Sequence, residues 1–182
     1  SWRNVPGVKA VWVNSPCNPT GEVYSAERMA GIVAAAREIG AVVLSDECYA
    51  LMQWRGATNS ADDDPLQSTP CALRSDVCAG SAEGVLVLYS LSKQSNMAGY
   101  RTAFIAGDES LIASMSAYRK QIGQIIPGPV QAAMAAGLRD LESVKVQHAR
   151  YRERLGVLVS ALRAYGYCTD MPDGALYVWV RA

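Results

Sequence analysis

Three short apolar runs, at residues 8–13, 41–44 and 85–89, have the length and composition of buried β-strands. Between the first two runs, apolar residues recur every three to four positions over residues 29–39, which predicts an amphipathic helix. Ser25 stands where a side chain can cap the start of that helix. A strand, a helix and a strand in this order predict a βαβ unit with parallel strands.

The rest of the chain continues the alternation of strands and helices. A fourth apolar run at residues 103–106 predicts a strand, and Asp108 can cap the helix that follows it. Two further helices are predicted at residues 130–138 and 141–165, and the second has a continuous apolar stripe. Residues 175–180 have the pattern of one more strand, so the chain is expected to be α/β.

A polar, turn-rich segment separates the second strand from the third. Residues 55–83 are long for a loop inside a compact domain. We expect a flexible stretch at residues 57–64 and a short helical turn at residues 66–73. The acidic triplet at residues 62–64 is interpreted as a solvated loop rather than a metal site, and no metal is expected.

The composition argues against several functional classes. The 182 residues include 17 basic and 17 acidic side chains, and this zero net charge argues against nucleic acid or an anionic membrane as a partner. No apolar run approaches the roughly 18 residues that a membrane helix needs. The only histidine, His148, excludes a multi-histidine metal site. The five cysteines form no C-x-x-C pair, which favours reduced thiols in a cytoplasmic protein.

Polar residues follow three of the predicted strands: Asn18 the first, Asp46 the second and Lys93 the third. Because ligands bind outside the carboxyl ends of strands in open parallel sheets, these residues are expected to converge on one site. An unprotonated lysine amine can form a Schiff base with a carbonyl group. Arg101, together with nearby serines, can bind a phosphate through parallel hydrogen bonds.

The same cluster contains groups that suit an aromatic cofactor. A buried Asp46 carboxylate would hold a pyridine nitrogen protonated and so make the ring an electron sink. Tyr49 lies three residues further on, where its hydroxyl can reach a phenolic oxygen. An aldehyde, a phosphate, a pyridine nitrogen and a phenolic oxygen occur together in pyridoxal 5′-phosphate (PLP), which is therefore the expected cofactor.

Four short motifs carry a resemblance to a known family. They are NPTG at residues 18–21, DECY at 46–49, SLSK at 90–93 and GYR at 99–101. In this order, with the first three each following a strand, they resemble the signatures of class I/II aminotransferases of PLP fold type I. The resemblance implies part of the α/β large domain of that fold, a mostly parallel sheet with helices on both faces.

The resemblance also implies a set of cofactor-binding residues. They are Asn18, Asp46, Tyr49, Ser90, Ser92, Lys93 and Arg101. Lys93 would be the catalytic lysine, which binds the cofactor covalently and then moves the substrate proton. Asp46 would pair with the pyridine nitrogen, while Asn18 and Tyr49 would hydrogen-bond the phenolic oxygen. The two serines and the arginine would hold the phosphate.

The resemblance divides the chain into two parts of a larger enzyme. Residues 1–140 would be the C-terminal half of the large, PLP-binding domain, and residues 141–182 the long interdomain helix and first strand of a truncated small domain. The family's phosphate loop, ring-stacking aromatic residue and substrate-carboxylate arginine have no counterpart in these residues. We therefore expect the segment alone to be inactive and the full protein to be a homodimer.

Within the family, the motifs look most like those of actinobacterial N-succinyldiaminopimelate aminotransferases. Such an enzyme would move an amino group from an amino acid, expected to be glutamate, to N-succinyl-2-amino-6-oxopimelate in lysine and diaminopimelate biosynthesis. Two alternatives keep the fold: a PLP-dependent C–S β-lyase, and an aminotransferase-like sensor domain of a transcription regulator. A third, the S-x-x-K nucleophile motif at residues 90–93, lacks its companion motifs S-D-N and K-T-G.

Overall fold

A computed structural model of the chain describes residues 2–54, 66 and 68–180. The strands in chain order are β1 (Ala10–Asn14), β2 (Val42–Asp46), β3 (Val85–Ser90) and β4 (Ala103–Gly107). The α-helices are α1 (Ala26–Glu38), α2 (Ser75–Cys78), α3 (Leu91–Gln94), α4 (Glu109–Gln121), α5 (Gly128–Arg139) and α6 (Leu141–Ala164). Two 3₁₀ turns complete the set, η1 (Trp2–Asn4) and η2 (Ala98–Tyr100).

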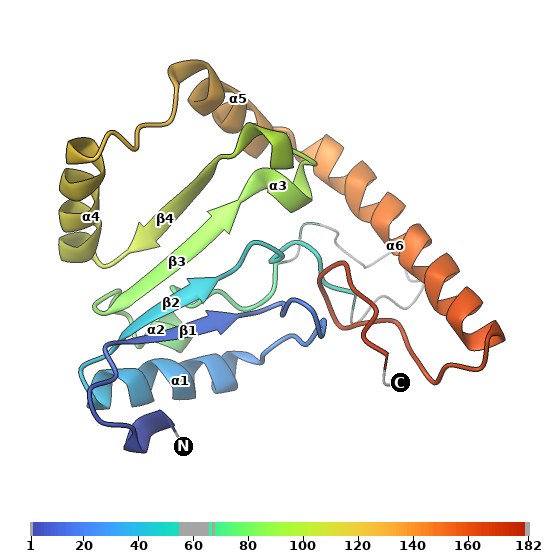
Figure 1. Cartoon of the computed structure of the whole chain (residues 1–182), viewed down its shortest axis with the longest axis horizontal. Helices are drawn as coiled ribbons and strands as arrows, with labels where there is room; N and C mark the ends of the chain where they lie inside the picture. The colour runs from blue at the N-terminus through green and yellow to red at the C-terminus, as the bar shows by residue number, and fades with distance from the viewer. Residues whose placement is uncertain (1, 55–65, 67, 181–182) are drawn as a thin grey trace.

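The four strands form one sheet in the order β1-β2-β3-β4. β1 pairs with β2 and β2 with β3 in parallel, whereas β4 runs antiparallel to β3. The sheet is therefore mostly parallel, as predicted, with one reversed edge strand. β1, β2 and β3 all point toward the side of the molecule where the C-terminal segment lies (Figure 1). Their carboxyl ends therefore meet at one edge of the sheet.

The main hydrophobic core lies between α1, α2 and one face of the sheet. α1 begins at the predicted cap, where Ser25 Oγ accepts a hydrogen bond from the Arg28 amide at 3.2 Å. The buried residues of this core are Val13, Met29, Val33, Ala36, Ala41, Val43, Ala72, Val77, Val85 and Val87. The predicted helix and the parallel βαβ unit are thus confirmed, because the apolar stripe of α1 covers alternate residues of three strands.

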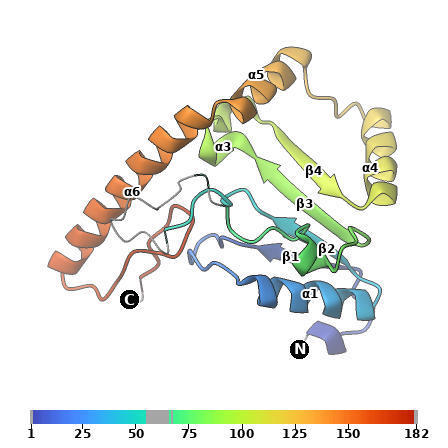
Figure 2. The same cartoon turned by 180° about the vertical axis from the view of Figure 1, so that it is seen from behind.

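The helices after the sheet also follow the predicted pattern. The Asp108 carboxylate caps α4 by accepting from the amides of Ser110 and Leu111, and Asp140 caps α6 in the same way. α6 runs along one side of the molecule, with the C-terminal segment between it and the ends of β1 and β2 (Figure 2). The ring of His148, on α6, lies 4.6 Å from that of Trp54, centroid to centroid. The domain division at residue 140 stays a prediction.

The short helix predicted at residues 66–73 lies elsewhere, at α2 (Ser75–Cys78). Before α2 the Arg74 amide closes one turn on Cys71 O at 3.1 Å, but the Thr69 amide donates to Ala50 O at 2.9 Å and the Ala72 amide to Glu47 Oε1 at 2.8 Å. Donors used in this way cannot build a helical turn. The stretch predicted to be flexible, residues 57–64, lies outside the described residues.

The strand predicted near the C-terminus is wrong for the described residues. A strand needs a neighbour along its length, and only one isolated bridge, between Gln53 and Gly174, occurs there. The segment instead bonds to loops: Gly174 N donates to Gly21 O and Ala175 N to Met52 O, both at 2.8 Å. Apolar alternation at this end therefore reflects packing against the loops after β1 and β2.

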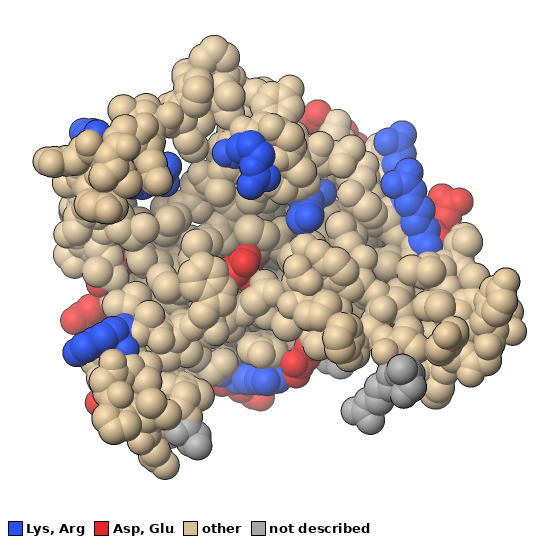
Figure 3. All heavy atoms as spheres, viewed as in Figure 1, with Lys and Arg blue, Asp and Glu red and all other residues tan. Residues whose placement is uncertain are grey.

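None of the helices in the described part of the chain is both long and apolar enough to cross a membrane. On the face drawn in Figure 3, basic and acidic side chains are dispersed among uncharged surface.

Gly107→Ala is expected to destabilise the fold by about 3 kcal/mol or more, measured by denaturant unfolding of the full-length protein. Gly107 has φ +140° at the end of β4, and an added Cβ would overlap the Val85 carbonyl oxygen and lie 2.9 Å from its carbonyl carbon. Gly31→Ala is the matched control, because Gly31 is exposed inside α1 with no atom near its Cβ position. The control should be neutral or stabilising, and equal stability of both variants would contradict the prediction.

Candidate active site

The period of two in the strands places three polar side chains on one face of the sheet. Asn14 and Asp46 are direct register partners at the ends of β1 and β2. Asp46 also pairs with Leu88 of β3, and Ser90 lies two residues beyond Leu88. Because side chains alternate along each strand, Asn14, Asp46 and Ser90 share the face opposite α1. The carboxyl edge of the sheet therefore presents an amide, a carboxylate and a hydroxyl side by side.

A cavity of about 420 Å³ opens at this edge. Its lining includes all seven predicted cofactor-binding residues: Asn18, Asp46, Tyr49, Ser90, Ser92, Lys93 and Arg101. They come from the loop after β1, from the end of β2 and the loop after it, from β3 and α3, and from the residue that follows η2. The structure thus brings together residues that are up to 83 positions apart in the sequence (101 − 18 = 83). Their individual roles toward a cofactor remain predictions.

Asn14 also lines the cavity, although sequence reasoning did not single it out. Its Oδ1 accepts from the Asn18 amide at 2.7 Å, and its Nδ2 donates to the Asp46 carbonyl at 3.1 Å. The side chain therefore ties the loop after β1 to the end of β2. The peptide bond between Asn18 and Pro19 is cis. The only sequence signal for Asn14 is its place at the last position of a strand.

Lys93 follows β3 directly, on the single turn of α3. Its Nζ lies 5.6 Å from the ring centroid of Tyr49, which is buried at 5% exposure. Burial, followed by a hydrogen bond between its hydroxyl and that of Tyr177, raises the pKa of Tyr49. The phenol therefore stays protonated at neutral pH and can donate a hydrogen bond into the cavity.

Two serines and one arginine form the other end of the cavity. Ser90 Oγ donates to Thr102 O at 3.1 Å and accepts from the Ser92 amide at 3.1 Å. The two serine hydroxyls are 2.7 Å apart. Arg101 has φ +52°, and one of its N–H groups donates to Ala98 O at 3.0 Å. Since a guanidinium has five N–H groups, Arg101 can donate to an anion in this cavity and keep that bond.

Cys48 is the one thiol that lines the cavity in the described part of the chain. Burial, the hydrogen bond with Asp46 and the nearby Asp46 charge raise its pKa to about 12. The thiolate is the nucleophilic form of cysteine, and it is scarce at neutral pH when the pKa is so high. The Cys48 thiol is therefore a poor nucleophile at neutral pH.

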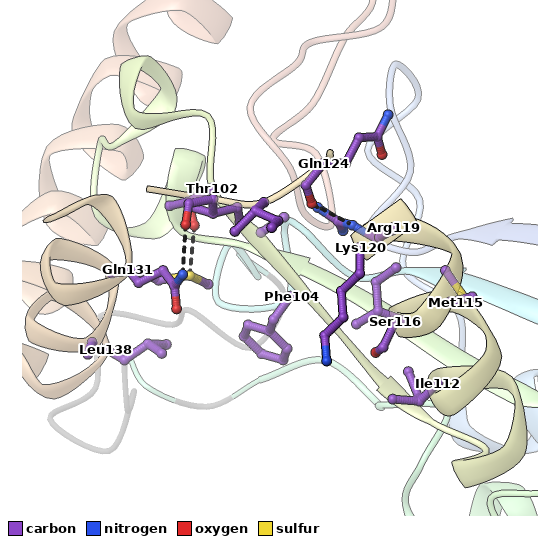
Figure 4. A pocket seen from close by; sticks show the side chains of 16 residues that line it. Thr102, Phe104, Ile112, Met115, Ser116, Arg119, Lys120, Gln124, Gln131 and Leu138 are labelled. Atoms are coloured by element: carbon purple, nitrogen blue, oxygen red, sulfur yellow. Dashed lines mark hydrogen bonds between the residues drawn. The ribbon is translucent and has the colours of Figure 1, made fainter. Parts of the chain in front are cut away.

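A larger cavity, of about 860 Å³, lies between β4, α4 and α5. Figure 4 shows apolar side chains such as Phe104, Ile112 and Leu138 around it. Its charged lining residues are Arg119 and Lys120, and Arg119 is bonded to the Gln124 carbonyl. Without a carboxylate among its described lining residues, this cavity lacks the acid–base groups gathered in the smaller one. The smaller cavity is therefore the candidate active site.

The groups at the smaller cavity suit PLP. Lys93 supplies an amine for the aldehyde, Asp46 a carboxylate for the ring nitrogen, and Arg101 with two serines the donors for a phosphate. Asn18 and Tyr49 can donate to the phenolic oxygen. The volume also lies in the ordinary range for ligand pockets. A polar group is thus present for each functional part of the cofactor.

Comparisons with known proteins agree with this chemistry. A family model described as "Aminotransferase class I and II" matches residues 3–182. The "4-dedimethylamino-4-oxo-anhydrotetracycline transaminase OxyQ" of Streptomyces rimosus is 44% identical over 172 residues, which is 94% of this chain and 45% of the relative. "Probable aminotransferase Rv1178" of Mycobacterium tuberculosis is 40% identical over 169 residues, 93% of this chain and 38% of the relative.

A solved aminotransferase structure from Neisseria meningitidis Z2491 is similar to the whole fold, with a TM-score of 0.84 and 27% identity over 100% of this chain and 45% of that one. The chain spans less than half the length of these relatives. Their names do not support the narrower resemblance to N-succinyldiaminopimelate aminotransferases, since the name of the Streptomyces relative refers to an anhydrotetracycline. The names do support the broader resemblance, to class I/II aminotransferases. The chain belongs to the class I and II aminotransferase family, with the fold type I architecture and the PLP dependence of that family.

Proposed function

We propose that the full protein is a PLP-dependent aminotransferase that moves an amino group between an amino acid and an oxo acid. The observation that carries this proposal is the convergence of Lys93, Asp46 and Arg101 on one cavity from α3, the end of β2 and the end of η2. An amine, an acid and a phosphate-binding group in one cavity suit a phosphorylated aldehyde better than a simple carbonyl substrate. Residues 1–182 alone are expected to be inactive.

In this proposal each predicted site residue has a separate role. Bound PLP supplies an electron sink that stabilises negative charge at the substrate's α-carbon. Lys93 would remove the proton from the substrate's α-carbon as general base and then deliver a proton to the cofactor carbon C4′ as general acid. Asp46 holds the ring nitrogen protonated, and Asn18 and Tyr49 orient the ring through its phenolic oxygen. Ser90, Ser92 and Arg101 anchor the phosphate.

The substrate pair we propose is glutamate and N-succinyl-2-amino-6-oxopimelate, which places the enzyme in lysine and diaminopimelate biosynthesis in the cytoplasm. Support comes from the run of residues 90–101 and from the DECY motif, which resemble those of N-succinyldiaminopimelate aminotransferases. A homodimer with the active site at the subunit boundary is proposed with it, following the family.

The test is a half-reaction of the full-length protein with PLP and single amino donors, followed by absorbance. Glutamate should convert bound PLP to its amino form with release of 2-oxoglutarate, and the succinylated oxo acid should restore the original spectrum. If only other oxo acids restored the spectrum, the proposed substrate would be wrong, but the proposed aminotransferase activity would stand. Release of pyruvate and ammonia from cysteine-type donors would favour the β-lyase, and binding of donors without any conversion would favour a sensor domain.

A further inference from the structure

The Tyr49 hydroxyl is bonded to a second tyrosine hydroxyl. The oxygens of Tyr49 and Tyr177 are 2.5 Å apart, and the rings meet edge to face with centroids 5.8 Å apart. Tyr49 lines the cavity, whereas Tyr177 lies 128 residues further along, in the C-terminal segment. The contact therefore joins the candidate active site to a distant part of the chain.

The backbone that presents Tyr177 is fixed to both active-site loops. Gly174 N donates to Gly21 O in the loop after β1, and Ala175 N donates to Met52 O after β2, each at 2.8 Å. Trp54 Nε1 donates in turn to Ala175 O at 2.7 Å. Ala175 is fully buried, with φ +59°. These bonds hold the second tyrosine in place independently of its own hydroxyl.

A phenol has one proton to donate, while its oxygen can accept. Once Tyr49 donates to the phenolic oxygen of a cofactor, its bond with Tyr177 has to run the other way, with Tyr177 as the donor. A hydroxyl whose oxygen accepts a hydrogen bond is itself a stronger donor. We infer that Tyr177 is a positioning residue, whose hydroxyl directs the Tyr49 proton into the cavity and strengthens its bond to the phenolic oxygen of PLP. This inference rests on the proposed function.

Other titratable groups also lie around Tyr49. Asp46 lies at the end of β2 and Cys48 in the loop after it, and Lys93 approaches from α3 with Nζ over the ring. Tyr151 of α6 packs against the same hydrophobic cluster. Because burial and the bond to Tyr177 raise the pKa of Tyr49, the Tyr49 phenol keeps its proton at neutral pH.

The test is Tyr177→Phe in the full-length holoenzyme, which keeps the ring contact and removes one hydroxyl. With a weaker bond from Tyr49, the phenolic oxygen holds the proton that it shares with the Lys93 nitrogen more tightly. The pH midpoint of the visible absorbance of bound PLP should therefore rise, by roughly half a pH unit. Tyr118→Phe is the matched control, because Tyr118 is exposed on α4, and it should leave the midpoint unchanged.

A double-variant cycle separates this role from simple packing. Tyr49→Phe should raise the midpoint further than Tyr177→Phe does, and the double variant should match Tyr49→Phe alone, because Tyr177 acts through Tyr49. An unchanged midpoint in Tyr177→Phe, or additive shifts in the double variant, would overturn the inference and leave the proposed function standing. A wild-type protein with no visible PLP band at any pH would overturn the proposed function itself. Unchanged thermal unfolding of each variant confirms that the fold is kept.

Discussion

Lys93→Ala in the full-length protein should abolish transamination, with kcat lower by about 10⁴-fold or more. The substitution removes both the amine that binds the cofactor covalently and the base that moves the substrate proton. Among the described residues that line the cavity Lys93 is the only lysine, so no neighbouring amine can replace it. The measurement is kcat with glutamate as donor, together with borohydride reduction of the wild-type holoenzyme and mass analysis of its peptides.

The reduced cofactor should be found on the peptide that contains Lys93 and on no other. Lys9→Ala is a suitable control, because Lys9 is exposed before β1 and outside the cavity, and its kcat should equal that of the wild type. Cofactor trapped on a different lysine, or a Lys93→Ala protein that retains its kcat, would remove the basis of the proposed function. Free lysine-like amines added to Lys93→Ala should restore a small part of the activity.

The features that could be predicted from sequence are those set by short stretches of chain. The NPTG loop after β1 is dense in proline and glycine, so it marks the strand end that carries Asn18 without any knowledge of the sheet. Asp46 and Lys93 also follow apolar runs closely in the sequence, so they too are marked as residues near strand ends. Parallel strands bring such ends together at one edge, and the cavity was expected there for that reason.

The features that could not be predicted depend on register and on contacts between distant residues. Asn14 matters because it is the direct partner of Asp46 across two strands, and a sequence does not state its register. Tyr177 matters because loop contacts at Gly174 and Ala175 bring it to Tyr49. The same contacts hold the start of the terminal apolar alternation against the loops, and the described residues there form one isolated bridge and no strand.

Asp46→Asn is expected to lower kcat by about a thousandfold while the fold is kept. The Asp46 side chain lies on the cavity face at the end of β2, and its Oδ1 accepts from the Cys48 amide at 3.2 Å. An asparagine oxygen can accept the same bond, so the loop keeps its shape and only the negative charge is lost. In the proposed reaction that charge keeps a proton on the ring nitrogen, where it offsets the negative charge that develops as Lys93 removes the α-proton.

A primary kinetic isotope effect tests whether the Asp46 charge assists removal of the α-proton. If proton removal becomes the slow step, α-deuterated glutamate should give a larger primary isotope effect on kcat in Asp46→Asn than in the wild type. Asp46→Glu, which keeps the charge but changes the side-chain length, should lose less activity than Asp46→Asn. Asp76→Asn serves as control, since the Asp76 side chain is exposed and pairs with Arg74 at the start of α2, outside the cavity. A kcat for Asp46→Asn within about threefold of wild type would show that the charge plays no part, because removing one preorganised charge partner costs far more than that.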